Sequence, residues 1–251
     1  MPFGLVMSGD RFFKILDTVD STNNYAMASI HAGMASHGMA WFTHEQTAGK
    51  GQRGKGWETE PRKNIAMSLV LQPESLHAKQ QFYLSAAIAL ACFEFFSGYA
   101  GDETKIKWPN DLFWRDRKAG GVLIENVFHG KKWKWAIAGI GININQTNFD
   151  KSIKAPVSLK QITGKEFDTV VLAKELYALL IKKISGLNAK SADKILEDYN
   201  QHLYKLNKNV TLKKDEISFE TVIKAVSPEG RLLTVDATDR KFDFGEVEWV
   251  L

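Results

Sequence analysis

Cysteine is almost absent from this 251-residue sequence, whose one thiol, Cys92, lies in an apolar run. A single cysteine excludes both a disulfide framework and a zinc cage within one chain, and it fits a reducing compartment. The six histidines show no metal-ligand spacing, so we expect no zinc site. A hydrophobic core must therefore stabilise the fold, and a 44% hydrophobic composition suffices for one full domain plus a small second one.

A leader and a membrane span are also missing from the pattern. The segment Met1 to Phe13 has neither a basic n-region nor a long apolar h-region. Elsewhere the apolar stretches are interrupted well short of the length that crosses a bilayer. We therefore expect a cytoplasmic protein without a membrane partner.

Charge of one sign is scarce. The sequence has 33 basic and 29 acidic residues, scattered along the chain, for a net charge of +4. This balance suits an anionic small molecule or an acidic partner protein, but it is too weak to indicate nucleic acid. The basic and aromatic stretch Lys131 to Trp135 alternates like an ordinary β-strand, with its aromatic side chains inward and its lysines outward.

The order of the expected elements indicates an α+β fold followed by a small all-β module. Strands are expected at Phe12 to Leu16, Met39 to Thr43, Ile65 to Leu71, Lys105 to Trp108, Leu112 to Trp114, Val122 to Phe128 and Lys134 to Ile144. Helices are expected from the N-cap Asp20-Ser21-Thr22 towards Gly33, and at Ala78 to Phe96, Val170 to Ile184 and Ala192 to Leu203. The module would comprise the strands Val210 to Leu212, Phe219 to Val226, Leu232 to Val235 and Phe242 to Trp249. We place the boundary near Lys205 to Lys208, which gives units of residues 1–205 and 206–251.

The most informative stretch is the glycine-rich, basic segment Gln46 to Trp57, which follows an expected strand. Exposed N–H groups and cations in such a loop can surround a phosphate. Gly49, Gly51 and Gly54 satisfy G-x-G-x-x-G, and the same loop satisfies a P-loop up to its last residue, Gly56. Both motifs require a helix immediately afterwards, whereas this sequence soon enters a strand. The loop must therefore work without a helix dipole; the alternative is a flexible basic hairpin without a ligand.

Two further turn-rich clusters, Lys107 to Leu112 and Asp116 to Val122, carry charge. Activation of a carboxylate on ATP builds negative charge on the α-phosphate, which fixed cations stabilise. Lys50 and Lys118 are the candidates, because each adjoins glycine or alanine, where little bulk hinders a ligand. For either lysine taken alone, a solvated surface charge is the alternative.

A third segment, Gly139 to Asn145, is an expected strand whose glycines permit close approach. Its Asn143 can donate and accept hydrogen bonds to an adenine or a ribose. A β-bulge is the alternative explanation for glycine in a strand.

Together these segments resemble the biotin protein ligases, also called holocarboxylase synthetases, of the monofunctional type without an N-terminal DNA-binding domain. The matches follow the family's order and spacing. They are D-S-T-N at Asp20 to Asn23, Q-x-A-G-R-G-R-x-G-R-x-W at Gln46 to Trp57, K-W-P-N-D at Lys107 to Asp111, K-x-x-G at Lys118 to Gly121 and G-I-G-I-N at Gly139 to Asn143.

The resemblance implies a catalytic domain like that of class II aminoacyl-tRNA synthetases, with a mixed sheet and helices, and an SH3-like C-terminal barrel. It implies a reaction in two steps. Biotin and MgATP would give biotinyl-5'-AMP and pyrophosphate, and a lysine of a biotin carboxyl carrier protein or carboxylase domain would then displace AMP. ATP and Mg²⁺ are thus the expected cofactors.

The resemblance also implies residue roles. Biotin would be bound by Ser21, Thr22, Asn23, Gln46, Lys50, Gly51, Gln52 and Lys118, and the adenylate by Arg53, Lys55, Trp57, Asn110 and Asn143. Lys50 and Lys118 would act catalytically by holding the biotin carboxylate and the α-phosphate. Asp111 would orient the incoming lysine or contact Mg²⁺.

The loop departs from the family pattern, in which many members have arginine at the positions of Lys50, Gln52 and Lys55. Charge is kept at two of these positions and lost at Gln52. We hypothesise that Gln52 holds the adenylate less firmly than arginine would, unless the neighbouring Arg53 substitutes for it.

Three other functions are alternatives to a biotin protein ligase. A lipoate or octanoate ligase shares the fold, but its substrate lacks the ureido head that Ser21 and Gln46 suit. A nucleic-acid module would use the strand of alternating lysine and tryptophan, and a degenerate ligase would have lost Lys50 and Lys118. We expect no DNA binding, because few residues precede Asp20, and a homodimer is an expectation from the family alone.

Overall fold

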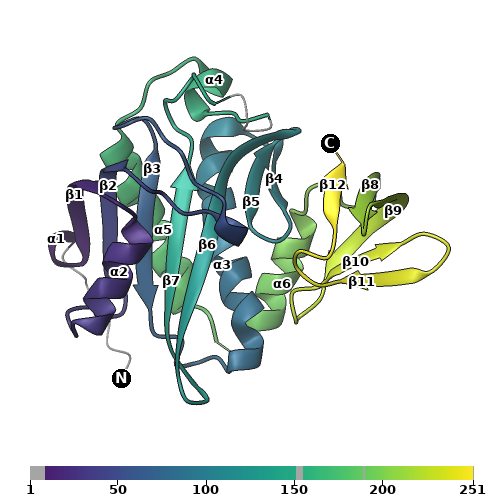
Figure 1. Cartoon of the computed structure of the whole chain (residues 1–251), viewed down its shortest axis with the longest axis horizontal. Coiled ribbons are helices and arrows are strands. Elements are labelled where there is room, and N and C mark those ends of the chain that lie inside the picture. The colour runs from purple at the N-terminus through teal and green to yellow at the C-terminus, as the bar shows by residue number, and fades with distance from the viewer. Residues whose placement is uncertain (1–8, 151–154, 189, 251) are drawn as a thin grey trace.

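The computed structural model describes residues 9–150, 155–188 and 190–250 and has two sheets (Figure 1). The larger has seven strands in the order β1-β2-β3-β7-β6-β5-β4, of which β1 and β2 pair in parallel and the other neighbours antiparallel. The smaller is antiparallel, with five strands in the order β11-β10-β9-β8-β12. The predicted α+β class is confirmed. Most of the segment expected to contain no leader lies outside the described residues.

The elements follow the predicted order closely. The large sheet has β1 (Phe13–Val19), β2 (Ala40–Gln46), β3 (Ile65–Leu71), β4 (Thr104–Lys107), β5 (Asp111–Trp114), β6 (Arg117–His129) and β7 (Lys132–Ile142). The helices are α1 (Gly9–Phe12), α2 (Thr22–His31), α3 (Gln81–Ala100), α4 (Leu159–Thr163), α5 (Thr169–Ser185) and α6 (Ala192–Gln201), with short 3-10 turns η1 (Gln52–Gly54) and η2 (Ala78–Gln80). The small sheet has β8 (Asn209–Lys214), β9 (Ile217–Val226), β10 (Leu232–Val235), β11 (Asp239–Phe242) and β12 (Glu248–Val250).

One predicted strand, Phe242 to Trp249, is wrong as a single element. A turn separates β11 from β12, because the Asp243 N–H donates to the Glu246 carboxylate at 2.8 Å and the Glu246 N–H donates back to the Asp243 carbonyl at 3.1 Å. Gly245 in this turn has a φ of +89°, which glycine adopts without a steric penalty.

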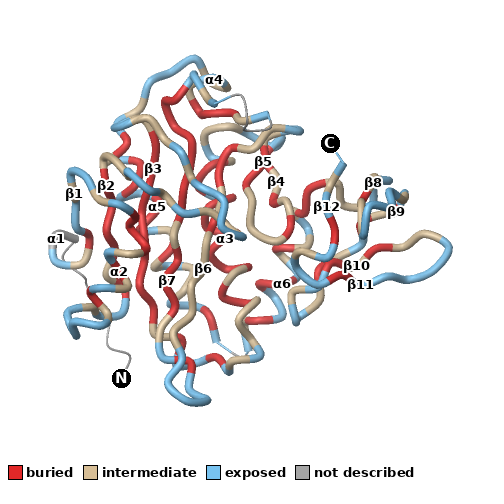
Figure 2. Tube along the Cα trace, viewed as in Figure 1, coloured by how far each residue is buried: buried red, intermediate tan, exposed pale blue. Residues whose placement is uncertain are grey.

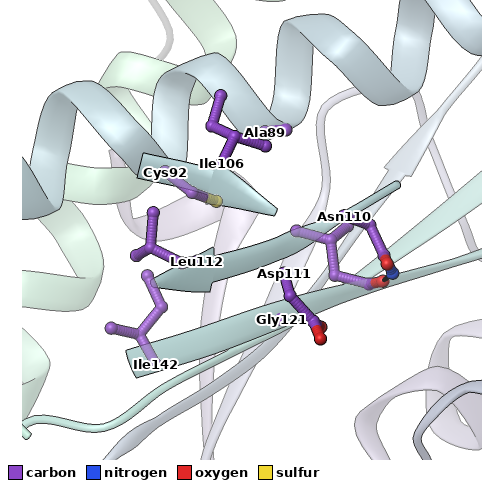
Figure 3. A pocket seen from close by; sticks show the side chains of 9 residues that line it. Ala89, Cys92, Ile106, Asn110, Asp111, Leu112, Gly121 and Ile142 are labelled. Atoms are coloured by element: carbon purple, nitrogen blue, oxygen red, sulfur yellow. Dashed lines mark hydrogen bonds between the residues drawn. The ribbon is translucent and has the colours of Figure 1, made fainter. Parts of the chain in front are cut away.

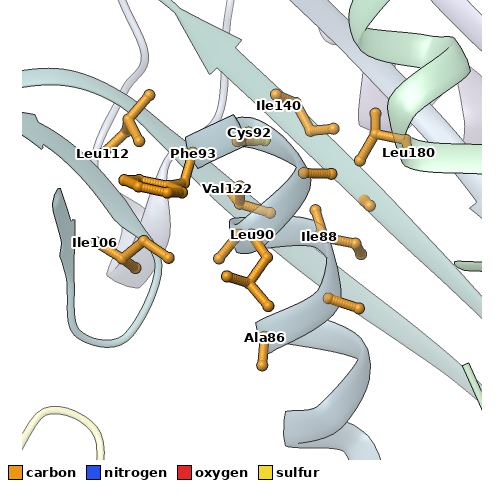
Figure 4. Packing of buried hydrophobic residues seen from close by; sticks show 14 of the residues in the cluster. Ala86, Ile88, Leu90, Cys92, Phe93, Ile106, Leu112, Val122, Ile140 and Leu180 are labelled. Atoms are coloured by element: carbon orange, nitrogen blue, oxygen red, sulfur yellow. The ribbon is translucent and has the colours of Figure 1, made fainter. Parts of the chain in front are cut away.

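Helix α3 lies behind the large sheet together with α5, whereas α2 covers the opposite face (Figures 1 and 2). All seven residues of β3 are buried between these layers, which explains its unbroken apolar sequence. Figure 4 shows Ile88, Leu90 and Phe93 of α3 against the sheet side chains Val122 and Ile140.

The expectation that no apolar stretch reaches membrane-spanning length is wrong for residues 78–100. This segment, η2 and α3, is the one helix among the described residues that is long and apolar enough to cross a bilayer. In this fold 67% of its most apolar window is buried inside the molecule. Packing against the sheet, α5 and α6 accounts for its composition.

The small sheet adjoins the large one around β4. The Trp108 indole N–H, directly after β4, donates to the Gly230 carbonyl between β9 and β10 at 2.9 Å. The buried side chains of the small sheet belong to the same hydrophobic cluster as α3. The second sheet starts at Asn209, and the division at residue 206 stays a prediction.

Helix α6 holds the turn between β4 and β5 through Tyr199. This side chain is fully buried, and its hydroxyl donates to the Pro109 carbonyl at 2.8 Å. Burial raises the pKa of Tyr199 well above the ordinary tyrosine value, and the negative charge of Asp111 raises it further. The folded protein therefore keeps this proton in alkali.

Tyr199 is expected to make the protein less stable in alkali. Above the ordinary tyrosine pKa of about 10 the unfolded chain releases the proton that the folded chain retains, whereas below it both states keep it. The free energy of unfolding should therefore fall as pH rises, by up to about 1.4 kcal/mol per pH unit from this group. Urea unfolding across this range should show a flatter fall for Tyr199→Phe, while Tyr25→Phe, at an exposed position, should match the wild type. An unaltered slope in Tyr199→Phe would contradict the assignment.

Candidate functional site

The side chains of strand β7 point alternately to the two faces of the large sheet. Its residues Ala138 and Ile140 belong to the core cluster of α3, whereas Ile137 packs in a second cluster with Ala26 of α2. Because side chains alternate along a strand, the intervening glycines face α2 as well. The polar residues expected from the sequence gather on this face.

Five side chains form a polar cluster at the N-terminus of α2. Thr22 and Asn23 are each 3% exposed and Ser68 of β3 is fully buried, and they lie beside Gln46 of β2 and Glu125 of β6. The Gln46 Oε1 accepts from the Thr22 N–H at 2.9 Å, and the Asn23 amide donates to the Glu125 carboxylate at 2.6 Å. One helix, α2, and three strands, β2, β3 and β6, thus supply one hydrogen-bond network.

Ser21, the N-cap residue of α2, lies next to this polar cluster. It is 1% exposed, and its side chain does not cap the helix. The hydroxyl is therefore not used for the bond that serine usually makes at this position.

Two glycines of β7 form the floor on which the site residues lie. A Cβ at Gly139 would stand 2.3 Å from the Asn23 Oδ1, and one at Gly141 would stand 2.3 Å from the Trp57 ring. These distances are too short for a side chain, so Asn23 and Trp57 rest directly on the backbone. The predicted role of these glycines in close approach fits this geometry.

The glycine loop (residues 46–57) folds back on itself in front of the sheet (Figure 1). Lys50 and Gly56 form an antiparallel bridge, and the Trp57 N–H donates to the Gly49 carbonyl at 2.8 Å. The loop contains the short turn η1 and continues into β3 without an α-helix. It therefore has no helix dipole to offer a phosphate, as predicted.

Trp57 presents a buried donor at this floor. Its indole N–H is buried and has no hydrogen-bond partner among the described residues. A buried unpaired donor is costly, and native proteins rarely leave one without a function. The Trp57 ring itself fills the space above Gly141, so a ligand atom reaches this N–H only if the ring shifts.

The cationic end of the site is an ion pair on neighbouring strands. The Lys118 ammonium lies 2.7 Å from the Asp111 carboxylate, and about a third of each side chain is exposed. A Cβ at Gly121 would stand 2.9 Å from the Asp111 Oδ1, and Gly121 pairs with Gly141 across β6 and β7. The floor under Trp57 is therefore continuous with the floor under Lys118.

A crevice beneath this end of the sheet is too small for a substrate. Figure 3 shows Cys92 and Ile142 on its apolar side and Asp111 at its other end. It holds about 10 Å³, roughly the space of one water. Burial raises the pKa of the Cys92 thiol to about 12. Lys118 is not among the residues that line this crevice.

Lys50 is exposed, and its charge acts on Asp20. Asp20 precedes the N-cap residue Ser21, and the Ala48 N–H donates to the Asp20 carbonyl at 2.8 Å. The hydrogen bond from Asn24 lowers the pKa of Asp20, and the positive charge of Lys50 lowers it further. Lys50 thus lies near the start of α2.

Other predicted residues have structural contacts. Asn110 donates to the Val122 carbonyl, and the Gln52 amide approaches that same carbonyl at 3.5 Å. Asn143 is 4% exposed, and its amide nitrogen lies 3.1 Å from the Val157 carbonyl and 3.4 Å from that of Lys118. In this structure the Asn143 amide nitrogen therefore fixes the backbone around Lys118.

The rest of the glycine loop points elsewhere. The Arg53 guanidinium lies beside Gly245 of the small sheet, where a Cβ would stand 3.3 Å from its central carbon. Lys55 is exposed at the loop tip, and the Gly51 N–H donates to its carbonyl at 2.7 Å. That Arg53 and Lys55 contact the adenylate stays a prediction.

Residues 15–143 match the model of the biotin/lipoate A/B protein ligase family. This match covers half of the chain and every residue of the polar cluster. The chain belongs to this family. The same segment contains Trp57, Asp111 and Lys118.

Curated relatives and solved structures agree with this assignment. The bifunctional ligase/repressor BirA of Bacillus spizizenii is 33% identical over 156 residues, which cover 61% of this chain and 47% of that protein. The biotin–[acetyl-CoA-carboxylase] ligase of Paracoccus denitrificans is 34% identical over 163 residues, covering 61% of this chain and 65% of that protein. The first curated relatives are thus matched over about half of their length.

The fold is similar to that of a biotin protein ligase from Aquifex aeolicus solved with biotin and ATP. The TM-score is 0.79 at 23% identity, and the alignment covers 95% of this chain and 98% of that one. The similarity therefore includes the small five-stranded sheet, as expected for an SH3-like C-terminal module.

Two members of the polar cluster were not predicted from the family motifs. Ser68 is the one polar residue in the apolar strand β3, and Glu125 is the one charged residue between Gly121 and Phe128. A single polar residue in a buried strand requires a partner. That signal could have identified Ser68, since all of β3 is buried, but not Glu125, which lies in a half-buried part of β6.

Proposed function

We propose that this chain is an ATP-dependent biotin–protein ligase. It would form biotinyl-5'-AMP from biotin and ATP and then transfer biotin to a lysine of a biotin carboxyl carrier protein or carboxylase domain. The observation that carries the proposal is the continuous glycine floor that joins the polar cluster to the Lys118–Asp111 pair. A cytoplasmic location and a homodimer belong to the same proposal.

The polar cluster favours a ureido head group. A ureido ring has N–H donors and a carbonyl acceptor, and Thr22, Asn23 and Gln46 provide several neutral partners for them. The dithiolane of lipoate and the alkyl chain of octanoate have no such donors. Binding either would leave buried polar groups unpaired, which costs about 1–3 kcal/mol for each group. Biotin is therefore favoured over the alternative substrates of the family.

The cationic end suits the acyl-phosphoryl junction. The carboxylate of biotin attacks the α-phosphorus of ATP, and pyrophosphate leaves with the negative charge of the broken bond. Lys118 and Lys50 would stabilise the charge on the α-phosphate oxygens by fixed electrostatics. Trp57, which rests on the floor at Gly141, would donate its indole N–H to the adenylate.

Mg²⁺ would be held mainly by the phosphates of ATP. Among the described residues no three His, Cys, Asp or Glu side chains gather into a metal site. Mg²⁺ commonly binds through one carboxylate plus substrate phosphates, and Asp111 is the carboxylate available here. The donor set therefore fits a metal that arrives with the nucleotide.

Asp111 has a second use in acyl transfer. The acceptor lysine must lose a proton as its amine attacks the carbonyl carbon and AMP leaves. Asp111 would orient that amine and accept its hydrogen bond. Its ion pair with Lys118, 2.7 Å away, supports this role, because Lys118 would hold the reacting phosphate.

Gln52→Arg is expected to lower the release of free adenylate about tenfold, because a charge-assisted hydrogen bond to the adenylate contributes about 1.5 kcal/mol or more. Arg53 is turned towards Gly245, so it does not substitute for the missing charge. Chromatography of the solution after incubation with biotin and MgATP, without an acceptor, measures the release. Gln72→Arg, outside the loop, is the control. Equal release from Gln52→Arg and the wild type would contradict the hypothesis.

The proposed function is tested by acyl transfer to a purified biotin carrier domain. Mass spectrometry should detect one biotin on the acceptor lysine when biotin and MgATP are present, and none on a carrier whose lysine is replaced by arginine. Labelling with lipoate or octanoate in place of biotin would identify the alternative ligase. No labelling by any acid would remove the proposal.

A further inference from the structure

The hydrogen bonds of the polar cluster have a definite direction. The Ser68 hydroxyl lies 2.6 Å from the Asn23 Oδ1 and 2.7 Å from the Thr22 hydroxyl, which itself lies 3.2 Å from the Gln46 Oε1. These three contacts share only the two hydroxyl hydrogens. An amide oxygen only accepts, so Ser68 donates its hydrogen to Asn23. The Thr22 hydroxyl then has two possible acceptors, the Ser68 hydroxyl at 2.7 Å and the Gln46 Oε1 at 3.2 Å, and it donates to the nearer one, Ser68.

Glu125 fixes the far end of this relay. Its carboxylate accepts from the Asn23 Nδ2 at 2.6 Å. An ionised carboxylate has no hydrogen to give, so the Asn23 amide cannot be reversed without losing this bond and the bond from Ser68. The relay therefore runs from Thr22 through Ser68 and Asn23 to Glu125.

The fixed direction determines what the polar cluster offers a substrate. With its hydrogen given to Ser68, the Thr22 hydroxyl presents a lone pair, which accepts from an N–H. The second hydrogen of the Asn23 amide and the amide nitrogen of Gln46 remain donors, which suit a carbonyl oxygen. Because the Gln46 Oε1 accepts from the Thr22 N–H, its orientation is fixed as well.

We propose that Ser68 and Glu125 are specificity-determining positioning residues, which select a head group carrying both N–H donors and a carbonyl acceptor by fixing the hydrogen-bond direction of Thr22 and Asn23. This inference rests on the proposed ligase function. Both residues lie behind the groups that would touch the substrate. Without either of them, the Asn23 amide can turn to present its oxygen as an acceptor, and the Thr22 hydroxyl can turn to present its hydrogen as a donor. The cluster then loses its selectivity.

The test measures ATP–pyrophosphate exchange with biotin and with lipoate for Ser68→Ala, Glu125→Leu and Glu125→Gln. Ser68→Ala and Glu125→Leu are expected to raise the KM for biotin about 10- to 100-fold, the range for loss of hydrogen bonds in a buried network, with kcat within about threefold. The ratio of kcat/KM for biotin to that for lipoate should fall by a similar factor. Glu125→Gln keeps an acceptor and should retain most of the wild-type selectivity.

Ser29→Ala is the matched control. Ser29 is a buried serine on α2, the helix that carries Thr22 and Asn23. Its hydroxyl donates to the Tyr25 carbonyl, away from the polar cluster. This variant should keep both KM and selectivity. Thermal unfolding of each variant checks its fold, and the two Glu125 variants serve as the test if Ser68→Ala is unfolded.

The outcomes separate the inference from the function on which it rests. A wild type that exchanges with lipoate or octanoate but not with biotin overturns the proposed function. A wild type that prefers biotin, with Ser68→Ala and Glu125→Leu equally selective, overturns the inference alone. Equal losses with both acids, or equal losses in Glu125→Gln and Glu125→Leu, would likewise contradict the relay.

Discussion

Lys118→Ala is expected to lower kcat/KM for biotin-dependent pyrophosphate exchange about a hundredfold to a thousandfold, the usual loss when one fixed group that stabilises transition-state charge is removed. Lys118 carries the positive charge at the end of the floor, 2.7 Å from Asp111. Its removal also leaves the Asp111 carboxylate unpaired, which would repel a phosphate. The loss should appear mainly in kcat.

Lys134→Ala provides the control for charge alone. Lys134 is an exposed lysine on β7, outside the site, so this variant changes the net charge by the same amount. It should retain the wild-type rate. Lys118→Arg should recover part of the activity, because it restores a cation beside Asp111. A loss of less than about threefold in Lys118→Ala would show that this lysine is an ordinary surface charge, since a catalytic cation is worth far more.

Substitution of the two floor glycines is expected to weaken the binding of two different substrates. A Cβ at Gly141 would meet the Trp57 ring and one at Gly139 would meet the Asn23 amide, each at 2.3 Å. Gly141→Ala should therefore raise the KM for ATP and Gly139→Ala the KM for biotin. Each increase should be about 10- to 100-fold, given that overpacking typically costs 1–3 kcal/mol. Steady-state exchange kinetics with each substrate varied separately measures both.

Gly98→Ala is the matched control for these changes. Gly98 lies in α3, and a Cβ there would have no heavy atom within 4 Å. It should leave both KM values unchanged and slightly stabilise the helix. Equal rises for both substrates in Gly139→Ala and Gly141→Ala would contradict the assignment of separate regions to biotin and adenylate.

Much of this architecture was predictable because local signals agree with the fold. The apolar segments at Ile65 to Leu71 and in α3 predicted buried elements, and the glycine loop lacked a following helix in both sequence and structure. The motifs also named Thr22, Asn23 and Lys118 as candidate site residues. Sequence order alone, however, could not show that Asn23 of α2 packs on Gly139 of β7 while Lys118 lies on the neighbouring strand β6.

The unpredicted features depend on contacts between distant segments. Ser68 and Glu125 acquire their meaning only when β3 and β6 flank β7 and bring them to Asn23. Arg53 lies beside Gly245 because the small sheet is positioned next to the glycine loop. No local sequence pattern specifies that position. Asn143 offers a polar amide in the sequence, but the fold uses its nitrogen to hold the backbone of Lys118.

The most direct measurement is acid-dependent ATP–pyrophosphate exchange by the wild-type protein with biotin, lipoate and octanoate compared side by side. If the polar cluster and the Lys118–Asp111 ion pair serve one reaction centre, labelled pyrophosphate should enter ATP with biotin and remain at background with the other two acids. Exchange that is as fast with lipoate or octanoate, or absent with all three, would contradict this account.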